Sequence, residues 1–465
     1  MYAKKLLTSF REAQNPGAPG MTQAPAFYRN LELALDVRRR DQNLIIDKPD
    51  LDDDLADFAS ADVLSFNWSG RIREAVLAEL ERNPNFELGS RGTRVVNGGS
   101  SYMYESEAEI ARITGAEAAY IVHSGFVANL AVLSSVPQPG DAIVYDALAH
   151  ASMHEGLLLS RTAHRLSFPH NDPDGLRDVL VSLREAHKEF REGTRSVLIL
   201  VESVYSMDGD VCPLVELLHV ANEVFPLGNA QFLVDETHCI GLLGPHGGGL
   251  VRMLGLENKI AIRTHTGSKS LGSSGGVVLA SKSILAAMLN VARCCVFSSP
   301  PSFLTVAAIR VGYQLLNSDE TPVLQERIQE AVKHFYNTLT ESEIYDDAVD
   351  AGILHVPSAD DWESLPFVTH IVPLRTRPRY NHYLYLHLLL FAKANAIPVG
   401  FPVVPKGTER VRLVFHAHNS IEEAARVAGA ICDWAKEMLE IESGEKSAAG
   451  LPTAARQALA MSGGD

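Results

Sequence analysis

Residues 231–249 read QFLVDETHCIGLLGPHGGG, residues 265–281 read HTGSKSLGSSGGVVLAS, and these two stretches decide the fold. An apolar run ends at Asp235, and His238 follows three residues later. Lys269 lies 34 residues after Asp235 (269 − 235), in a turn rich in Thr, Gly and Ser. In sheets built from parallel strands, ligands bind beyond the carboxyl ends of the strands. We therefore expect these three side chains to share one site.

The three residue types suit pyridoxal 5′-phosphate (PLP), a cofactor that needs a Lys Schiff base and an acidic partner for its ring nitrogen. Lys269 would supply the amine, Asp235 the carboxylate, and His238 a contact to the phenolic oxygen. A lone Lys is usually surface charge, and a lone Asp at a strand end usually caps a turn. The combination with small residues around Lys269 favours the cofactor interpretation.

Further candidates follow other predicted strands. His150 lies just beyond a strand in YDALAHASMHEG, where an imidazole can stack on a ring and exchange protons. A buried structural histidine is the alternative. Ser124, Gly125 and Phe126 open a predicted helix, whose free amides and dipole attract an anion. Together with Thr266 they predict a phosphate site.

Arg410 and Arg412 alternate along one predicted strand, so both lie on the same face. Either could clasp a substrate carboxylate with two hydrogen bonds, and exposed charge on an edge strand is the alternative. His416 and His418 also alternate, but no acidic third ligand accompanies them. We predict no metal site.

Apolar runs and helical stretches alternate from residue 118 onward. Strands are expected at 118–122, 142–145, 165–168, 196–201 and 232–234, with helices at 127–135, from about 151, at 174–190 and at 214–225. This alternation predicts an α/β fold with a mostly parallel sheet covered on both faces. The Gly-rich residues 89–101 precede it and are expected to form a loop.

The pattern changes after residue 281. Residues 294–303 resemble a strand with a Ser-Ser-Pro-Pro turn, helices are expected at 304–316, 323–339, from about 383 and at 421–441, and strands at 369–374, 398–403 and 411–415. These elements predict a smaller α+β domain. We predict four segments: an N-terminal arm at 1–75, a large cofactor-binding domain at 76–310, a small domain at 311–442 and a disordered tail at 443–465.

Composition excludes several classes of protein. The chain has 465 residues, 46% hydrophobic and 21% charged, as in an ordinary globular enzyme. A net charge of −16 argues against nucleic-acid binding. The five cysteines are irregularly spaced and indicate neither a disulfide framework nor a zinc site.

No apolar segment of a secretion signal or a membrane span is apparent, so we expect a cytoplasmic protein. Lys4, Lys5 and Arg11, without an acid among the first eleven residues, leave a mitochondrial transit peptide as an alternative.

Several motifs together resemble the α-oxoamine synthases, a family of fold-type I PLP enzymes that includes 8-amino-7-oxononanoate synthase, 2-amino-3-ketobutyrate CoA ligase, 5-aminolevulinate synthase and serine palmitoyltransferase. The resemblance covers about residues 63–440. It rests on NWSG with Asn67, HSGFVAN, YDALAHAS, His170-Asn171-Asp172, VYSMDGD, VDETHCIGLLGPHGGG, THTGSKSLG, FPVVPKG and VRLVFHAHNS.

The resemblance implies a role for each matching residue. Lys269 would bind the cofactor and move protons, Asp235 would pair with the ring nitrogen, His238 and Ser206 would hold the phenolic oxygen, and His150 would stack on the ring. Ser124, Gly125, Phe126 and Thr266 would hold the phosphate, and Ser298 or Ser299 would reach the cofactor phosphate of a neighbouring subunit in a homodimer. Arg412 would bind the substrate carboxylate, and Asn67 would line the substrate site.

Three positions depart from the family pattern: Met103 in SSYMYES, Thr237 before the motif His, and Ser270 after the catalytic Lys. Thr237 is expected to lie against the cofactor ring, where its bulk would alter substrate choice. None of the three removes a group needed to bind the cofactor.

The resemblance implies a PLP-dependent acyltransferase that condenses glycine, alanine or serine with an acyl thioester, on CoA or a carrier protein, and releases CO2. A PLP aminotransferase or C–C lyase on the same fold is the enzymatic alternative. A catalytically silent partner subunit is a second alternative, and a dinucleotide-binding dehydrogenase a distant third, because no GxGxxG follows the first strand. The amino acid, the acyl chain and its carrier, the pathway and the need for a second chain stay open.

Overall fold

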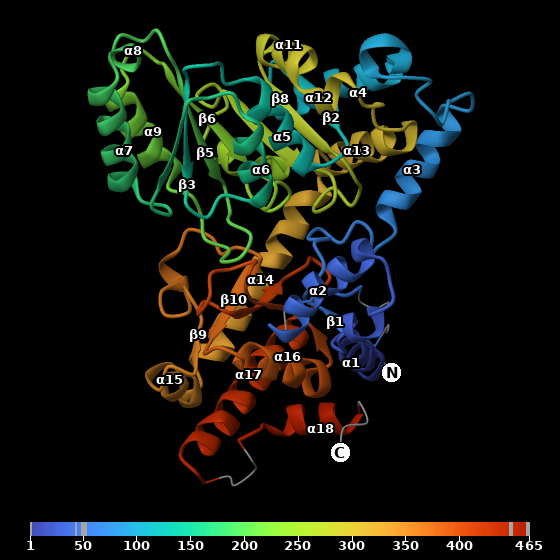
Figure 1. Ribbon diagram of the computed structural model, residues 1–465, viewed down its shortest axis with the longest axis vertical. Helices are drawn as coiled ribbons and strands as arrows, with labels where there is room; N and C mark the ends of the chain where they lie inside the picture. The colour runs from blue at the N-terminus through green and yellow to red at the C-terminus, as the bar shows by residue number, and fades with distance from the viewer. Residues whose placement is uncertain (1, 42–43, 48–53, 446–449, 462–465) are drawn as a thin grey trace. The chain divides into compact units, whose positions relative to one another are not determined.

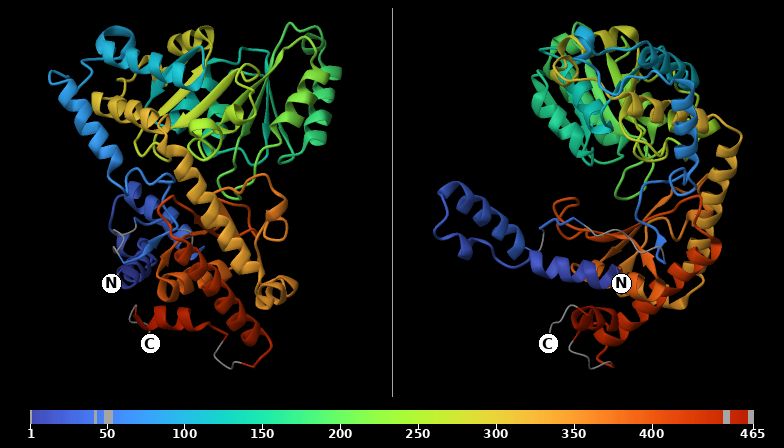
Figure 2. Two further views of the ribbon diagram at one scale, coloured as in Figure 1. Left: turned by 180° about the vertical axis from the view of Figure 1, so that it is seen from behind. Right: turned by 90° about the vertical axis from the view of Figure 1, so that its right-hand side faces the viewer.

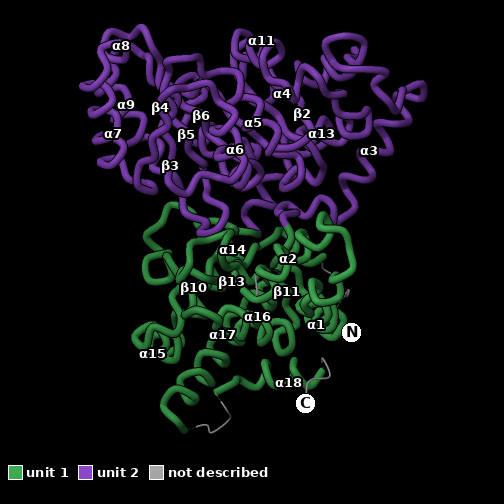
Figure 3. Tube along the Cα trace, in the orientation of Figure 1, with its two compact units in different colours: residues 1–60, 328–465 green, residues 61–327 purple. Residues whose placement is uncertain are grey.

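The computed structural model describes residues 2–41, 44–47, 54–445 and 450–461. The chain forms two compact units (Figure 3). Residues 61–327 make the large unit, and residues 1–60 with 328–465 make the small unit. The division into an arm, a cofactor-binding domain, a small domain and a tail, each with its own role, stays a prediction.

A seven-stranded sheet forms the centre of the large unit (Figure 1). Its strands are β2 (Ala118–Val122), β3 (Ala142–Asp146), β4 (His164–Phe168), β5 (Val197–Glu202), β6 (Ala230–Asp235), β7 (Ile262–Thr266) and β8 (Gly276–Ala280). Their order is β2-β8-β7-β6-β5-β3-β4, and only β8 runs antiparallel to its neighbours. The predicted α/β class with a mostly parallel sheet is confirmed.

Helices cover this sheet. They are α3 (Arg71–Arg82), α4 (Ser101–Thr114), α5 (Gly125–Ser135), α6 (Ala151–Leu159), α7 (Pro173–Ala186), α8 (Lys188–Arg191), α9 (Leu214–Val224), α10 (Gly249–Met253), α11 (Lys282–Val291), α12 (Arg293–Val296) and α13 (Phe303–Leu316). Strands β5, β7 and β8 are buried along their whole length, as expected for strands covered on both faces. Helix α5 is apolar on most sides because it packs against α6, α11 and the sheet.

Two predicted segments of the large unit differ from the structure. Residues 293–296 form the short helix α12 instead of a strand, because Cys295 is buried in the cluster that also contains residues of α5 and α11. Within the predicted loop 89–101, residues Arg94–Gly98 form a turn of π-helix, η2. There the Arg94 guanidinium pairs with the Glu107 carboxylate through two bonds of 2.6 Å, which stabilise the turn.

The small unit contains a four-stranded sheet in the order β12-β13-β10-β9. Its strands are β9 (Leu354–His355), β10 (Ile371–Thr376), β12 (Ile397–Val399) and β13 (Arg410–Val414), and β1 (Ala56–Asp57) pairs separately with β11 (Ala394–Asn395). Helices α15 (Glu343–Asp350), α16 (Tyr380–His387) and α17 (Ile421–Glu442) accompany this sheet, and α14 (Glu320–Thr340) contains the boundary between the units.

The two ends of the chain are helical where they are described. The N-terminal residues form α1 (Tyr2–Ala13), the short η1 (Ala18–Met21) and α2 (Ala26–Arg40), drawn in dark blue in Figure 2. Residues Thr453–Met461 form α18, although disorder was predicted from residue 443. The disorder was predicted from the Gly-, Ala- and Ser-rich composition, but small alanines let α18 pack closely, with Ala454 fully buried. Residues 446–449 and 462–465 of the predicted tail lie outside the described residues.

No helix in the described ranges has the length and the apolar character that a membrane crossing requires.

Candidate active site

One edge of the large sheet gathers the predicted residues of the large unit. Strands β2, β3, β5, β6 and β7 all point their carboxyl ends toward this edge. The segments that follow these strands carry, in chain order, Ser124, His150, Ser206, His238 and Lys269. The parallel arrangement therefore brings together side chains that lie up to 145 residues apart in the sequence (269 − 124).

Lys269 and His238 are direct neighbours. The Lys269 Nζ atom lies 3.0 Å from the His238 Nε2 atom. The turn after β7 holds Lys269 in this position, since the Gly272 amide donates to the Lys269 carbonyl at 2.9 Å. An amine beside an imidazole can exchange a proton with it, as a lysine that works as a nucleophile and a base requires.

Asp235 ends β6 and is 5% exposed. One carboxylate oxygen accepts from the Asn129 side-chain amide at 2.7 Å, and the other accepts from the backbone amide of Thr237 at 2.9 Å. Asn129 was not among the predicted site residues. The sequence feature that could have identified Asn129 is its strongly polar side chain in the middle of the apolar helix sequence GFVANLAVLSS.

Glu202 ends the neighbouring strand β5, in register with Asp235. Burial raises the pKa of the Glu202 carboxyl well above its usual value, and the negative charge of Asp235 raises it further. Both effects favour the neutral form of the Glu202 carboxyl beside Asp235.

His150 begins α6 as its N-cap residue, and its Nδ1 atom accepts from the backbone amide of Ser152 at 3.2 Å. The protein atoms around the imidazole lower the pKa of His150 by desolvation. Asp235 opposes this effect, and the charge of Lys269 adds to it. These electrostatic effects indicate that His150, Asp235 and Lys269 belong to one site.

The N-terminus of α5 forms a cradle beside the same residues. Ser124 caps α5, and its side chain accepts from the Val127 amide at 3.1 Å. A Cβ atom on Gly125 would lie 3.0 Å from the Thr266 Cβ and 3.2 Å from its hydroxyl oxygen. Glycine at this position therefore keeps an opening at the helix N-terminus, next to a hydroxyl group. Backbone amides at a helix N-terminus bind phosphate.

These observations fit PLP. A buried carboxylate at Asp235, an amine at Lys269 and backbone amides beside Gly125 are the kinds of group that a ring nitrogen, an aldehyde and a phosphate would require. Each is a matching residue type, and all three lie at one edge of the sheet.

A charged cluster connects the loops beneath this edge. His170 donates from Nδ1 to Asp146 at 2.8 Å and from Nε2 to Asp210 at 2.6 Å. The two carboxylates raise the pKa of His170 to about 10, although desolvation opposes the shift. His170 thus links the loop that leads to His150 with the loop that carries Ser206.

The remaining predicted residues are placed as follows. Asn67 is exposed, and its side-chain nitrogen lies 3.1 Å from a Cβ built on Gly272, near the Lys269 turn. Ser298 and Ser299 follow α12, where Ser299 is exposed. Their contact with a second subunit stays a prediction.

Arg412 belongs to the small unit. It lies on β13, between Pro373 of β10 and Ile397 of β12. Burial lowers the pKa of the Arg412 guanidinium to about 10. Its role as a carboxylate clasp stays a prediction.

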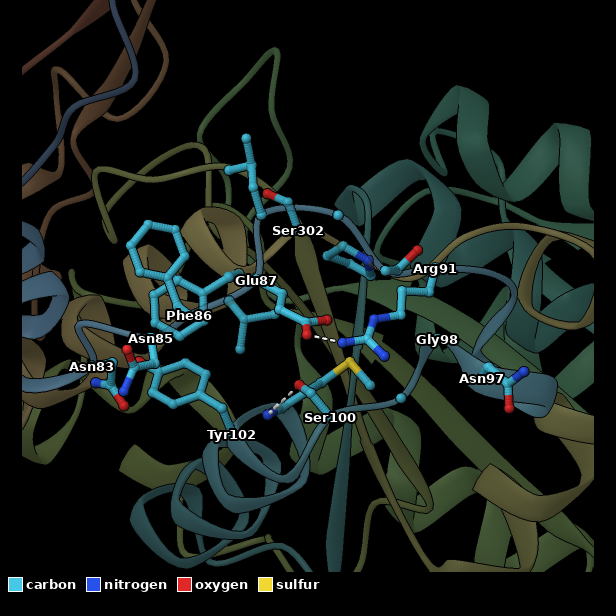
Figure 4. A pocket seen from close by; sticks show the side chains of 18 of the residues that line it. Asn83, Asn85, Phe86, Glu87, Arg91, Asn97, Gly98, Ser100, Tyr102 and Ser302 are labelled. Atoms are coloured by element: carbon cyan, nitrogen blue, oxygen red, sulfur yellow. Dashed lines mark hydrogen bonds and ion pairs between the residues drawn. The ribbon is translucent and has the colours of Figure 1, made fainter.

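A separate cavity of about 600 Å³ lies in the large unit, and none of the predicted cofactor residues lines it (Figure 4). Its wall includes Phe86, Arg91, Tyr102 and Phe303. The Phe86 and Phe303 rings stack at 4.6 Å, and Arg91 is paired with Glu87. Asparagine and serine side chains also line this cavity, among them Asn83, Asn85 and Ser302, so its wall is mixed in polarity.

Comparisons with known proteins agree with this geometry. The family model described as aminotransferase class I and II matches residues 53–431. The chain is 46% identical to an aminoacyl transferase sphA of Aspergillus fumigatus, covering 96% of this chain and 94% of the relative. It is 36% identical to an 8-amino-7-oxononanoate synthase of Emericella nidulans, covering 86% and 95%.

Solved structures show the same fold. A serine palmitoyltransferase of S. paucimobilis with bound PLP superposes with a TM-score of 0.69 and 24% identity, covering 82% of this chain and 87% of that structure. The predicted family and the predicted cofactor are thereby confirmed. The chain belongs to the aminotransferase class I and II family and is a PLP-dependent enzyme of the α-oxoamine synthase group.

Proposed function

We propose that the protein joins a small amino acid (glycine, alanine or serine) to an acyl thioester carried on CoA or a carrier protein, and releases CO2 and free thiol. The product is an α-amino ketone. The bond between the α-carbon and the acyl carbon forms while the bond from the acyl carbon to sulfur breaks. The α-carboxylate leaves as CO2, and a proton takes its place.

One observation supports this proposal above the others: Lys269 Nζ lies 3.0 Å from His238 Nε2, on the same sheet edge as the buried Asp235. A silent subunit has no need to keep an amine, an imidazole and a buried carboxylate together. The curated relatives named as 8-amino-7-oxononanoate synthase and 5-aminolevulinate synthase favour acyl transfer over the aminotransferase or lyase alternatives.

The residues divide the work. When bound, PLP supplies an aldehyde that captures amines and a ring that accepts the electrons released at the α-carbon. Lys269 holds the cofactor at rest and moves the α-proton. Asp235 keeps the ring nitrogen protonated, and His238 holds the phenolic oxygen. The amides at the start of α5 hold the phosphate, and Arg412 binds the substrate carboxylate.

The first test combines a spectrum with a thiol assay. Purified protein loaded with PLP should show a visible absorption band that shifts with one of glycine, alanine or serine, and should release thiol from an acyl thioester in the presence of that amino acid. Lys269→Ala should lose the band and lower kcat by about 10²–10⁴-fold, the range for loss of a positioned acid–base group.

Lys282→Ala is the matched control, because Lys282 is an exposed lysine at the start of α11. It should behave as wild type. Amino-group transfer without thiol release would instead establish the aminotransferase alternative. A PLP-loaded protein that neither shifts its band with an amino acid nor releases thiol would favour the silent-subunit alternative.

A further inference from the structure

A continuous set of hydrogen bonds leads from Asp235 to His150. The Asn129 side-chain amide donates one proton to Asp235 at 2.7 Å and the other to the Ser152 hydroxyl oxygen at 2.9 Å. The Ser152 hydroxyl oxygen lies 2.8 Å from His150 Nδ1. Asn129 is 1% exposed and Ser152 is fully buried, so water does not replace these bonds.

The donor and acceptor capacity of each group determines the direction of these hydrogen bonds. The Asn129 amide oxygen accepts from the Thr264 hydroxyl at 2.9 Å, which places the Asn129 nitrogen toward Asp235 and Ser152. The Ser152 hydroxyl accepts from Asn129 and still has its proton and a second lone pair, so its own bonding capacity leaves the direction of its bond to His150 open. The backbone amide of Ser152, which can only donate, points at the Nδ1 atom at 3.2 Å. Nδ1 is therefore an unprotonated acceptor, and the Ser152 hydroxyl donates its proton to it.

The position of His150 at the start of α6 also favours a neutral imidazole with an unprotonated Nδ1 atom. Its Nδ1 atom serves as the cap acceptor of this helix. The positive end of the helix dipole disfavours a cationic imidazole at this place. The neutral ring then carries its proton on Nε2.

We propose that Asn129 and Ser152 are positioning residues that hold His150 as the neutral Nε2–H tautomer and tie its orientation to the Asp235 carboxylate. Neither residue needs to touch the substrate. The relevance of this arrangement to turnover rests on the proposed function, whereas the tautomer itself is a property of the folded chain.

The test is nitrogen-15 NMR of histidine-labelled full-length protein, with PLP bound and after its removal. Wild type should show His150 with Nδ1 unprotonated and Nε2 protonated at neutral pH. Ser152→Ala removes one of the two donors to Nδ1 and keeps the backbone amide, so it should raise the apparent pKa of His150 and increase the fraction of the Nδ1–H tautomer relative to wild type. Ser152→Thr, which keeps the hydroxyl, should restore the wild-type signals. With PLP bound, Ser152→Ala should lower kcat by about tenfold, the factor that corresponds to the loss of one hydrogen bond of about 1.4 kcal/mol.

Ser135→Ala is the matched control. Ser135 is equally buried, and its hydroxyl donates within α5 to the Ala131 carbonyl. It should leave the His150 signals unchanged. If Ser152→Ala folds poorly, Ser152→Cys gives the same readout with a weaker donor. Wild-type tautomer and pKa in both Ser152→Ala and Ser152→Cys would overturn the proposal. Failure of the acyl-transfer assay alone would leave the NMR result standing and would reject the proposed function instead.

Discussion

At the scale of single residues, His170 has a raised pKa because its imidazole lies between two carboxylates. Its imidazole is held between the Asp146 and Asp210 carboxylates, and its ring packs edge-on against Tyr205 at 4.5 Å between centroids. Asn171 adds a backbone bond to Asp146 and a side-chain bond to Asp210. The cluster fixes two loops of the site relative to each other.

This cluster predicts a pH-dependent contribution to stability. The pKa of His170 is raised from 6.5 to about 10, so its stabilisation is full below the unfolded pKa and is lost as pH rises through the folded pKa. His170→Gln should lower the free energy of unfolding by about 1–2 kcal/mol near neutral pH, a value discounted because Asp210 is partly exposed.

Urea unfolding at several pH values measures this effect. The difference between wild type and His170→Gln should shrink as pH approaches 10 and then vanish. His219→Gln is the control, because His219 is exposed and lies 3.8 Å from Glu223. A difference that does not change with pH would mean that His170 acts through packing alone.

At the scale of elements, the start of α5 depends on Gly125. Any side chain there would push against Thr266, at 3.0 Å from its Cβ. Gly125→Ala should raise the dissociation constant of PLP about tenfold, because overpacking of 1–3 kcal/mol would fall on the opening predicted to hold the phosphate. Fluorescence titration of the stripped protein with PLP measures this.

Gly429→Ala provides the comparison for α5. Gly429 lies within α17, and a Cβ there meets no atom within 4 Å. This variant should bind PLP as wild type does and gain up to about 1 kcal/mol in stability. Equal PLP affinity in the two variants would place the phosphate elsewhere.

At the scale of the whole molecule, the C-terminal helix completes the small unit. Glu437 of α17 is 7% exposed and accepts from the Thr453 backbone amide at 2.9 Å and from its hydroxyl at 2.5 Å. A chain that ends at residue 445 would leave this carboxylate without these two donors. The free energy of unfolding of this shortened chain should be lower than that of the full-length chain by about 1–3 kcal/mol or more.

Replacing Glu437 in the shortened chain tests the cause. Glu437→Met removes the buried charge, so it should recover part of the stability that truncation removes. In the full-length chain the same substitution should destabilise, because Thr453 loses its acceptor. Chemical denaturation of the four proteins gives the coupling between the two changes. A shortened chain as stable as the full-length chain would show that α18 is dispensable.

Much of the fold was predictable because periodicity is a local property. The strands ending at Val122, Asp146, Glu202 and Asp235 were expected within one or two residues. The strand predicted within residues 294–303 and the disorder predicted for the tail were wrong. Short apolar runs and alanine-rich segments take their conformation from the elements that they pack against. The placement of Lys269 beside His238 agrees with the expected shared site.

Local sequence therefore determines the pattern of strands and helices and the mostly parallel sheet. It also determines the edge at which Asp235, His238 and Lys269 lie, because parallel strands align their carboxyl ends. Tertiary structure alone decides the partners of those residues. Asn129 reaches Asp235 across 106 positions of sequence, and His170 meets Asp146 and Asp210 from a third segment. Such bonds depend on strand register and on helix packing, which no single stretch of the chain encodes.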